Sequence, residues 1–337
     1  MLEGWGANGI IADQKGHNLH CSAPQIVFGE PSEKLYTAKK THISLPHIIT
    51  DNETVAKMAL SHLLDHGFRR FAFCGFDDMI WSRQREEYFY KEVTKYGYEC
   101  HIYKQAKSKL QRLWKNEKPT LVNWLKSLPR PIGVMVCSDD RGQDVIEAAK
   151  IVGVQLPDQI AIVGVDNEDI LCSLAEPSLS SIALNTEKAG FETAELLAKL
   201  MNGQKMNGQK IIIEPTHVIT RASTDVLAVE DKHVAEAMRF IRQNAKKKIQ
   251  VSDVVTAAGI SRCSLYKRFF YVRGHSLYEE IIHTRMEQVA QMLLETDMSV
   301  FQIAYAMGDD NDKHIARAFR KEFGISPQAY RKRHNCP

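Results

Sequence analysis

The feature of this sequence that most constrains its fold is a helix-turn-helix pattern that occurs twice near the C-terminus. In the first copy, at 251–270, a short helix precedes a turn at Gly259, and Ser261 opens a second helix. Leu265 and Phe269 are four residues apart and therefore lie on one face of that second helix. Its outward-facing residues are then Arg262, Ser264, Tyr266 and Lys267.

The second copy, at 299–324, begins with Ser299 and Gln302, a capping-box pair that starts a helix. Gly308 marks its turn. The helix after the turn has an apolar residue at every fourth position, which predicts a buried stripe made of Ile315, Phe319 and Phe323. Basic residues fall mainly on the other sides of this helix: Lys313, His314, Arg317, Arg320 and Lys321.

A long helix at 276–294, which contains no Gly or Pro, joins the two copies. This helix spans roughly 28 Å, and one turn of duplex DNA is about 34 Å long. Because these lengths are similar, the second helix of each copy can enter successive segments of the major groove on one face of the duplex. Arg and Lys side chains pair with guanine edges and hold phosphates. The alternative is an all-helical domain with no role in nucleic-acid binding. We expect DNA contacts from Arg262, Ser264, Tyr266, Lys267, Lys313, His314, Arg317 and Arg320.

Several motifs of this region also occur together in one known family. They are GIS with Leu265, Arg268 and Phe269, then IAYAMG and RAFRKEFGISPQAYRK, closed by Gly324, Ser326, Pro327, Tyr330 and Arg331. On these motifs about a third of the chain resembles the DNA-binding domain of AraC/XylS-type transcription regulators. The resemblance implies that double-stranded operator DNA is a partner.

The second copy departs from the family pattern in two ways. Asp309 stands where the family usually has an aromatic residue, and Lys313 stands where a small hydroxyl residue is common. The segment 308–314 is also unusually acidic. Because acidic groups near phosphate are unfavourable, base contacts from the second copy are less firmly predicted than those from the first.

Helices and strands alternate regularly from Thr50 to Arg221. The expected helices are 50–67, 82–97, 117–128, 140–153 and 186–203. The expected strands are 70–76, 98–103, 131–138, 160–165 and two closing strands within 210–221. Strands that are continuously apolar and alternate with helices predict an α/β domain whose parallel sheet is covered on both faces.

This α/β half carries four segments typical of another family: TDN at 50–52, HLLDHGFRRFAF at 62–73, the run from VCSDD to VGVDN at 136–167, and EPSLSSI at 176–182. On them it resembles the sugar-binding domain of LacI-type repressors and type I periplasmic binding proteins. Its combination with an AraC-type end, and WSRQRE at 81–86, implies a regulator that activates a pentose-use operon, with a sugar such as xylose as effector and RNA polymerase as partner. The family domain begins with a strand, a helix and a strand that this sequence lacks, so a truncated or misplaced start is expected.

Composition and charge agree with two domains of different kinds. A chain of 337 residues favours two domains, which we place at 1–221 (sugar binding) and 233–337 (DNA binding), with a linker at 222–232. The residues from Val226 onward carry a net charge of +5 and the preceding residues −2, as expected when only one domain binds nucleic acid.

The sequence also predicts a reduced, cytoplasmic protein without a membrane span. Its cysteines are scattered and form no CxxC motif, and it has neither a signal-peptide pattern nor a long apolar run.

Ligands of doubly wound sheets bind beyond the carboxyl ends of the strands, and four residues there suit a sugar. The carboxylates of Asp139 and Asp166 accept hydroxyl hydrogens, and the guanidinium of Arg85 donates to ring or hydroxyl oxygens. The ring of Trp81 suits the C–H face of a pyranose. The resemblance favours these same positions. The alternatives are that the two aspartates only cap helices and that Trp81 belongs to the core; Asp51 is a lesser candidate.

The other patterns predict no catalytic site, cofactor or metal. GWGANG at 4–9 matches GxGxxG but lacks a preceding strand. His62 and His66 have metal-ligand spacing on one helix, but no third ligand is evident. No Ser-His-Asp set or phosphate loop is visible, which argues against a sugar-metabolising enzyme.

We interpret the chain as a sugar-responsive transcription regulator that acts as a homodimer. Two alternatives remain. One is a constitutive DNA-binding regulator whose α/β half only dimerises. The other is a repressor that responds to a different small sugar.

Overall fold

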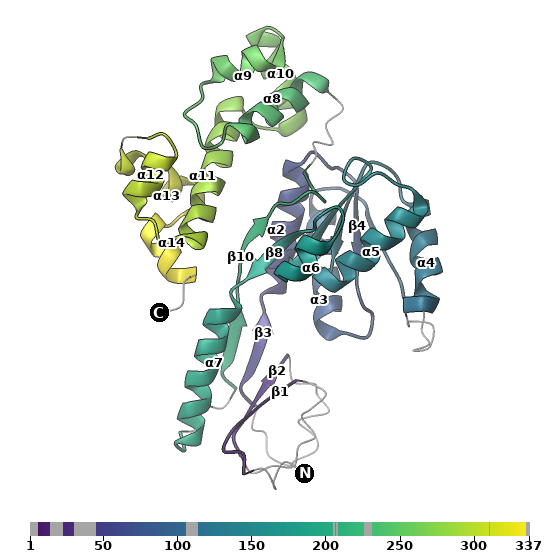
Figure 1. Cartoon of the computed structure of the whole chain (residues 1–337), viewed down its shortest axis with the longest axis vertical. Coiled ribbons are helices and arrows are strands. Elements are labelled where there is room, and N and C mark those ends of the chain that lie inside the picture. Colours follow the sequence, from purple (N-terminus) through teal and green to yellow (C-terminus); the bar gives the residue numbers. More distant parts are fainter. Residues whose placement is uncertain are drawn as a thin grey trace.

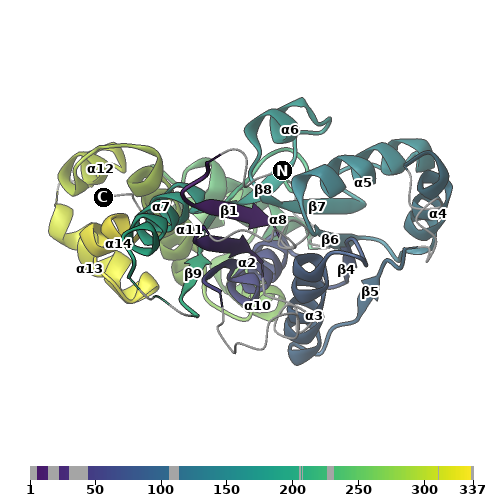
Figure 2. The ribbon, with the colours of Figure 1, turned by 90° about the horizontal axis from the view of Figure 1, so that it is seen from below.

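The structure is a computed structural model that describes residues 6–13, 23–29, 45–105, 114–204, 206, 208–225, 231–309 and 311–334. It contains an α/β domain followed by an all-helical domain (Figure 1). Helices α12 to α14 lie at one end of the molecule and helix α4 at the other (Figure 2). This arrangement confirms the expected fold class.

The larger sheet has six strands in the order β10-β8-β7-β6-β4-β5. They are parallel except for β10, which runs antiparallel to β8. The central strands are buried on both faces, as their continuous apolar sequence predicts. The bounds are β4 (Phe71–Cys74), β5 (Cys100–Ile102), β6 (Ile132–Val136), β7 (Ile160–Asp166), β8 (Ser180–Leu184) and β10 (Pro215–Ile219).

Successive residues of these strands enter two separate cores. Phe71 and Phe73 pack under α2 (Asn52–Asp65) and α3 (Ile80–Lys95). Ala72 and Cys74 pack under the helices of the opposite face. Those helices are α4 (Trp114–Ser127) and α5 (Asp139–Val152), and the short α6 (Asp169–Leu174) lies beside α5.

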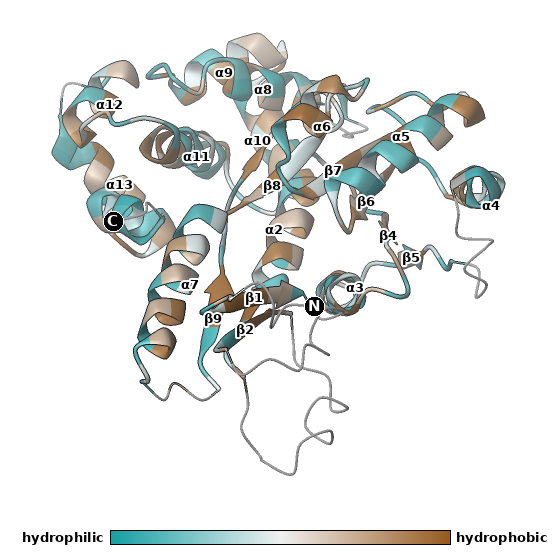
Figure 3. Cartoon of the chain, turned by 60° about the horizontal axis from the view of Figure 1, so that its bottom comes forward, coloured by the Kyte–Doolittle hydropathy of each residue, from teal (hydrophilic) through white to brown (hydrophobic). Residues whose placement is uncertain are grey.

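A second, smaller sheet forms another lobe with its own core. Its four parallel strands have the order β1-β2-β3-β9. The core joins Ile26, Ile48 and Ile211 to the apolar face of α7 (Thr186–Met201), and β9, which pairs with β3, is largely brown in Figure 3. The strand bounds are β1 (Ile10–Asp13), β2 (Gln25–Phe28), β3 (His47–Thr50) and β9 (Lys210–Ile213).

The helical domain has two halves that share one long helix, as expected. Helix α11 (Leu277–Glu295) contributes Leu277 and Ile281 to a first core and Met286 and Val289 to a second. The helices of the first half are α8 (Lys232–Gln243), α9 (Val251–Ala258) and α10 (Arg262–Arg273). Those of the second half are α12 (Val300–Ala306), α13 (Asp312–Phe323) and α14 (Pro327–His334).

The predicted helix starts in this domain are confirmed. Ser261 and Ser299 are N-caps whose side chains accept hydrogen bonds from backbone N–H groups, and Ser299 forms its capping box with Gln302. Gly259 ends α9 in the left-handed conformation that favours glycine (φ +67°). Among the described residues, no helix is long and apolar enough to cross a lipid bilayer.

Three expectations for the α/β half need correction. Helix α6 and strand β8 were not expected, and β9 and β10, expected as two closing strands of one sheet, belong to different sheets. The expected linker also starts too early. Ser223 and Thr224 are fully buried, and the backbone of Ser223 hydrogen-bonds to Ile162 and Ser178. The first domain therefore continues through Thr224.

Candidate functional sites

The structure brings together three of the four residues expected to bind sugar. Trp81 and Arg85 lie in α3, which follows β4, and Asp166 ends β7, so all three lie at the carboxyl edge of the larger sheet, where ligands of this fold bind. Arg85 of α3 is the centre of the group: its guanidinium lies 3.6 Å from the carboxylate of Asp166 and 5.1 Å from the centre of the Trp81 ring. The group therefore offers a ligand the N–H donors of the Arg85 guanidinium, the carboxylate acceptor of Asp166 and the apolar ring of Trp81.

Protein contacts hold Arg85 in place. Its side chain is 4 % exposed. The Nε–H donates to Oδ1 of Asn52 at 2.9 Å, and an Nη1–H donates to the carbonyl of Cys137. Asn52 in turn donates to Gln84. Asn52 is therefore a positioning residue that the chemical argument missed, although the TDN motif at 50–52 contains it.

Asp166 has an unusual backbone conformation, and the pKa of its side chain is raised. Its φ is +104° and that of Asn167 is +53°, a region that residues other than glycine seldom adopt and that is often found at functional sites. The side chain is 46 % exposed. Burial among the surrounding residues raises its pKa to about 6; the positive charge of Arg85 opposes this shift, and the negative charges of Asp139 and Asp140 add to it.

Asp139 is oriented toward the protein rather than toward Arg85. Its Oδ1 accepts a hydrogen bond from the Ser181 hydroxyl at 2.6 Å, and its Oδ2 accepts one from the Glu168 N–H at 2.8 Å. This position requires glycine at 164, because a Cβ there would lie 2.2 Å from Oδ1. Burial raises the pKa of Asp139. In this structure Asp139 links β8 and the loop after β7, which positions Asp166.

The sequence left open whether Asp139 and Asp166 only cap helices, and the structure shows that neither is an N-cap residue. The N-cap of α5 is Ser138, not Asp139, and Asp166 caps no helix, since the N-cap of α6 is Glu168. Asp51, the lesser candidate, does cap α2 and accepts hydrogen bonds from the N–H and hydroxyl of Thr54. Trp81 is partly buried and packs edge-on against Phe76.

Two cavities among the described residues lie away from this group. One, of about 640 Å³, is lined by residues of α3 and β5 together with Asp77 and Lys104. The other, of about 500 Å³, lies between the two domains, with His62 and His66 in its wall. The two histidines are engaged within the protein: His62 pairs with Thr224 at 2.8 Å, and burial lowers the pKa of both rings, that of His62 to about 4.

The expected DNA-reading residues lie on the two second helices, α10 and α13. On α10, Arg262 donates to the Tyr266 hydroxyl at 3.2 Å and lies over its ring at 5.4 Å, while Lys267 is exposed and Ser264 half-buried. Arg268 instead pairs with Asp231 at 3.0 Å. The exposed residues of α13 include all four that were expected: Lys313, His314, Arg317 and Arg320.

The acidic departure at Asp309 has a structural explanation. Its side chain is 14 % exposed and lies 3.7 Å from Arg285 and 3.8 Å from Lys248. Arg285 also donates to the carbonyls of Met307 and Lys247. The Asp309 charge is therefore balanced by protein cations, and it opposes DNA contacts from α13 less than the sequence suggested.

A two-lobed α/β domain with a polar group at its strand ends, followed by a double helix-turn-helix domain, defines a ligand-responsive DNA-binding regulator. Residues 60–224 match the periplasmic binding protein-like domain family, and residues 254–333 match a helix-turn-helix domain family. The chain belongs to the family of the xylose operon regulatory proteins, and is thus a sugar-responsive transcription regulator rather than an enzyme.

Three relatives illustrate this membership. The Haemophilus influenzae xylose operon regulatory protein is 32% identical over 96% of this chain and 84% of its own length. The Escherichia coli K12 protein of the same name is 28% identical over 98% of this chain and 85% of its own. A solved structure described as the xylose-binding transcription activator xylR is 29% identical, covers 98% of this chain and 87% of its own, and superimposes with a TM-score of 0.57.

Proposed function

We propose that this protein binds xylose or a closely similar pentose between its two lobes and then activates transcription of a pentose-use operon. The observation that carries the proposal is the Arg85–Asp166 pair at the strand ends, with Trp81 beside it. The relatives support the choice of sugar, because they are named as xylose regulators and one solved relative is described as xylose-binding.

The chemistry of the group suits an uncharged polyol. The Arg85 fork donates to ring or hydroxyl oxygens, and the Asp166 carboxylate accepts two hydroxyl hydrogens. Trp81 offers an aromatic face to the C–H groups of the sugar. Asp139 would contribute chiefly by holding the loop that carries Asp166, since both of its carboxylate oxygens accept hydrogen bonds from the protein.

We further propose that two chains act together as a homodimer in the cytoplasm and recruit RNA polymerase. The sugar-binding domain would extend through Thr224, and the DNA-binding domain would begin with α8. Arg262, Ser264, Tyr266 and Lys267 of α10, with Lys313, His314, Arg317 and Arg320 of α13, would contact operator DNA. The exposure of cations along both helices supports this assignment.

Calorimetry with D-xylose, L-arabinose, D-ribose and D-glucose tests the sugar site. We expect heat of binding with a pentose, and a loss of affinity of at least about tenfold in Asp166→Asn, because the amide is a weaker acceptor than the carboxylate. Asp158→Asn, at an exposed position before β7, is the matched control and should bind normally. If no sugar binds the wild-type chain, the α/β half has another role, such as dimerisation alone.

A transcription reporter separates activation from repression. Expression should rise when both the protein and the pentose are present, and stay low with either one alone. Expression that is low with the protein alone and released by sugar would instead identify a repressor.

A further inference from the structure

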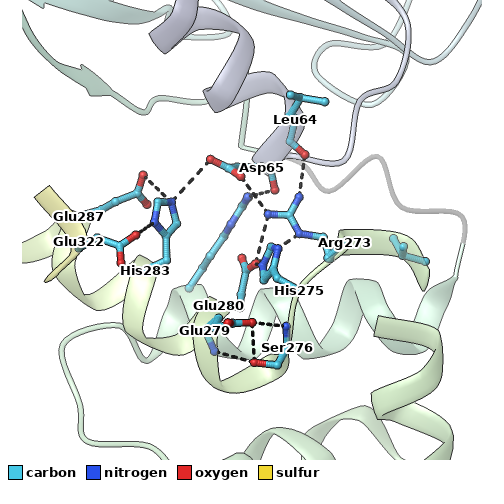
Figure 4. A network of polar contacts seen from close by, with 12 residues as sticks. Leu64, Asp65, Arg273, His275, Ser276, Glu279, Glu280, His283, Glu287 and Glu322 are labelled. Atoms are coloured by element: carbon cyan, nitrogen blue, oxygen red, sulfur yellow. Dashed lines mark hydrogen bonds and ion pairs between the residues drawn. The ribbon is translucent and has the colours of Figure 1, made fainter. Parts of the chain in front are cut away.

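One histidine between the two domains is surrounded by three carboxylates from different elements. His283 of α11 faces Asp65 at the end of α2, Glu287 one turn further along α11, and Glu322 of α13 (Figure 4). Asp65 belongs to the sugar-binding domain, whereas the other three belong to the DNA-binding domain. The group therefore spans the junction between the domains.

The distances suit a shared ion better than direct hydrogen bonds. Nε2 of His283 lies 3.4 Å from Oε1 of Glu287 and 3.8 Å from Oδ2 of Asp65, beyond the usual N–H···O range of about 2.7–3.2 Å. One ligand atom from each of these residues lies within 4.8 Å of the others. A tetrahedral Zn²⁺ with bonds near 2.1 Å places its ligands about 3.4 Å apart.

Neighbouring groups orient these ligand atoms. Nδ1 of His283 hydrogen-bonds to Glu322 at 2.7 Å. When Nδ1 donates this bond, a metal at Nε2 replaces the second ring proton and takes up the Nε2 lone pair. A carboxylate on the second ring nitrogen is the usual partner of a metal-binding histidine. Oδ1 of Asp65 accepts a hydrogen bond from Arg273 at 3.0 Å, so Oδ2 remains on the side of His283.

The surroundings offer both access and a preference for positive charge. Asp65, His283 and Glu287 line the cavity of about 500 Å³ between the domains, which provides room for a water molecule as fourth ligand. The carboxylates of Asp65, Glu287 and Glu322 lie 2.7–3.8 Å from the ring nitrogens of His283, so the space between them favours a cation.

We propose that Asp65, His283 and Glu287 form a binding site for a divalent transition-metal ion of the zinc class, with water completing a tetrahedral set. One nitrogen and two carboxylate oxygens are ligands that Zn²⁺ accepts. The bound ion would join the end of α2 in the sugar-binding domain to α11, the helix shared by both helix-turn-helix units. The site differs from the sugar site at Arg85 and does not depend on it.

Metal titration of the full chain tests the proposal. The protein is stripped with a chelator, dialysed and titrated with Zn²⁺ by calorimetry, and with Co²⁺, whose visible absorption reports tetrahedral coordination. We expect one ion per chain that His283→Asn fails to bind. Glu322→Gln, which keeps all three ligands, should lower the affinity about 10–100-fold, while Asp297→Asn, at an exposed position after α11, should leave Zn²⁺ affinity unchanged.

A second variant covers the possibility that His283→Asn does not fold. Glu287 is exposed, so Glu287→Gln leaves the core intact and should still lower Zn²⁺ affinity by at least about tenfold. The proposal is wrong if the wild-type chain takes up no ion, or if the His283 and Glu287 variants bind as many ions as tightly as it does. The cluster would then be an ion-pair network of a protonated imidazole.

Discussion

Asp166 differs from an ordinary surface aspartate in its backbone conformation, in its raised pKa and in the hydrogen bonds made by its neighbours. Its positive φ is followed by a residue that is held in place: the Asn167 N–H donates to the Ser181 hydroxyl, and Arg221 donates to the Asn167 side chain. A residue kept in a strained conformation by its surroundings is preorganised. Asp166 therefore needs little reorganisation to accept hydrogen bonds from a sugar.

The acidity of Asp166 predicts a pH dependence of sugar binding. Its pKa is raised to about 6, so the carboxylate, which we propose accepts sugar hydroxyls, predominates above that pH and is lost as the pH falls through it. If only the charged form binds, affinity at pH 5 should be about tenfold lower than at pH 7. Calorimetry at a series of pH values measures this.

The variant Asp166→Asn is the control for this pH dependence. In Asp166→Asn the residual affinity should vary little between pH 5 and pH 7, because the titrating group has been removed. A wild-type affinity that stays constant across this interval would show that Asp166 does not accept hydrogen bonds from the sugar as a carboxylate.

At the scale of elements, the helices of the DNA-binding domain were predictable because their signals are local. Serine caps, left-handed glycines and apolar residues four apart act within one or two turns. Strand β8 was not predictable in this way, because its buried positions Ser180 and Ser181 are polar. Their hydroxyls are satisfied by the Arg221 carbonyl and the Asp139 carboxylate, partners that only the folded sheet brings near.

Helix α10, which we propose reads the operator, gives a direct prediction at this scale. Arg262 lies in the first turn of α10, exposed and held by Tyr266. Arg262→Ala should weaken operator binding about 5–150-fold, the effect of losing a base contact of about 1–3 kcal/mol, while sugar binding is unchanged. Fluorescence anisotropy, with DNA sites selected by the protein from a random pool, measures this loss.

A second cation of the same domain serves for comparison. Arg239 of α8 is exposed and pairs with Glu236 on its own helix. Arg239→Ala should leave operator affinity within about twofold, since exposed ion pairs contribute little. Equal operator affinity of Arg262→Ala and the wild type would show that α10 is not the reading helix.

At the scale of the whole molecule, the DNA-binding domain contacts both parts of the sugar-binding domain. One patch joins Arg273 to the Leu64 carbonyl and to Asp65 at the end of α2, beside the larger sheet. The other joins α14 to Asn185 and Lys188 at the start of α7 in the smaller lobe. A change in the angle between the lobes would therefore shift the DNA-binding domain.

Contacts between residues far apart in the chain, such as that of Arg273 with Asp65, are the part of the structure that the sequence does not predict. The α/β class, the double helix-turn-helix unit and Arg85 with Asp166 follow from periodicity, local motifs and family resemblance. The partner of Arg273 lies about two hundred residues away in the chain. Nothing local in the sequence indicates which of many charged residues will meet it, so the junction between the domains could not be predicted.

Arg273 is the residue through which we test this junction. Its side chain is 3 % exposed, and it also pairs with the buried Glu280 at 3.2 Å. Arg273→Met should reduce the effect of the sugar on DNA affinity by at least about threefold, because it removes the Arg273 contacts to Leu64 and Asp65 at the end of α2. Arg333→Met removes a pair to Glu214 in which Arg333 is 57 % exposed, and should change the effect much less. If both variants respond to sugar like the wild type, these contacts do not carry the coupling.

The central claim is that sugar binding to the α/β domain changes DNA binding by the helical domain. The most direct measurement is the operator affinity of the full wild-type chain, with and without saturating D-xylose, at several salt concentrations. We expect xylose to change the affinity about 5–150-fold, the range of a coupling free energy of about 1–3 kcal/mol, and added salt to weaken binding in both states. Operator affinity that stays the same when xylose is bound would contradict the claim.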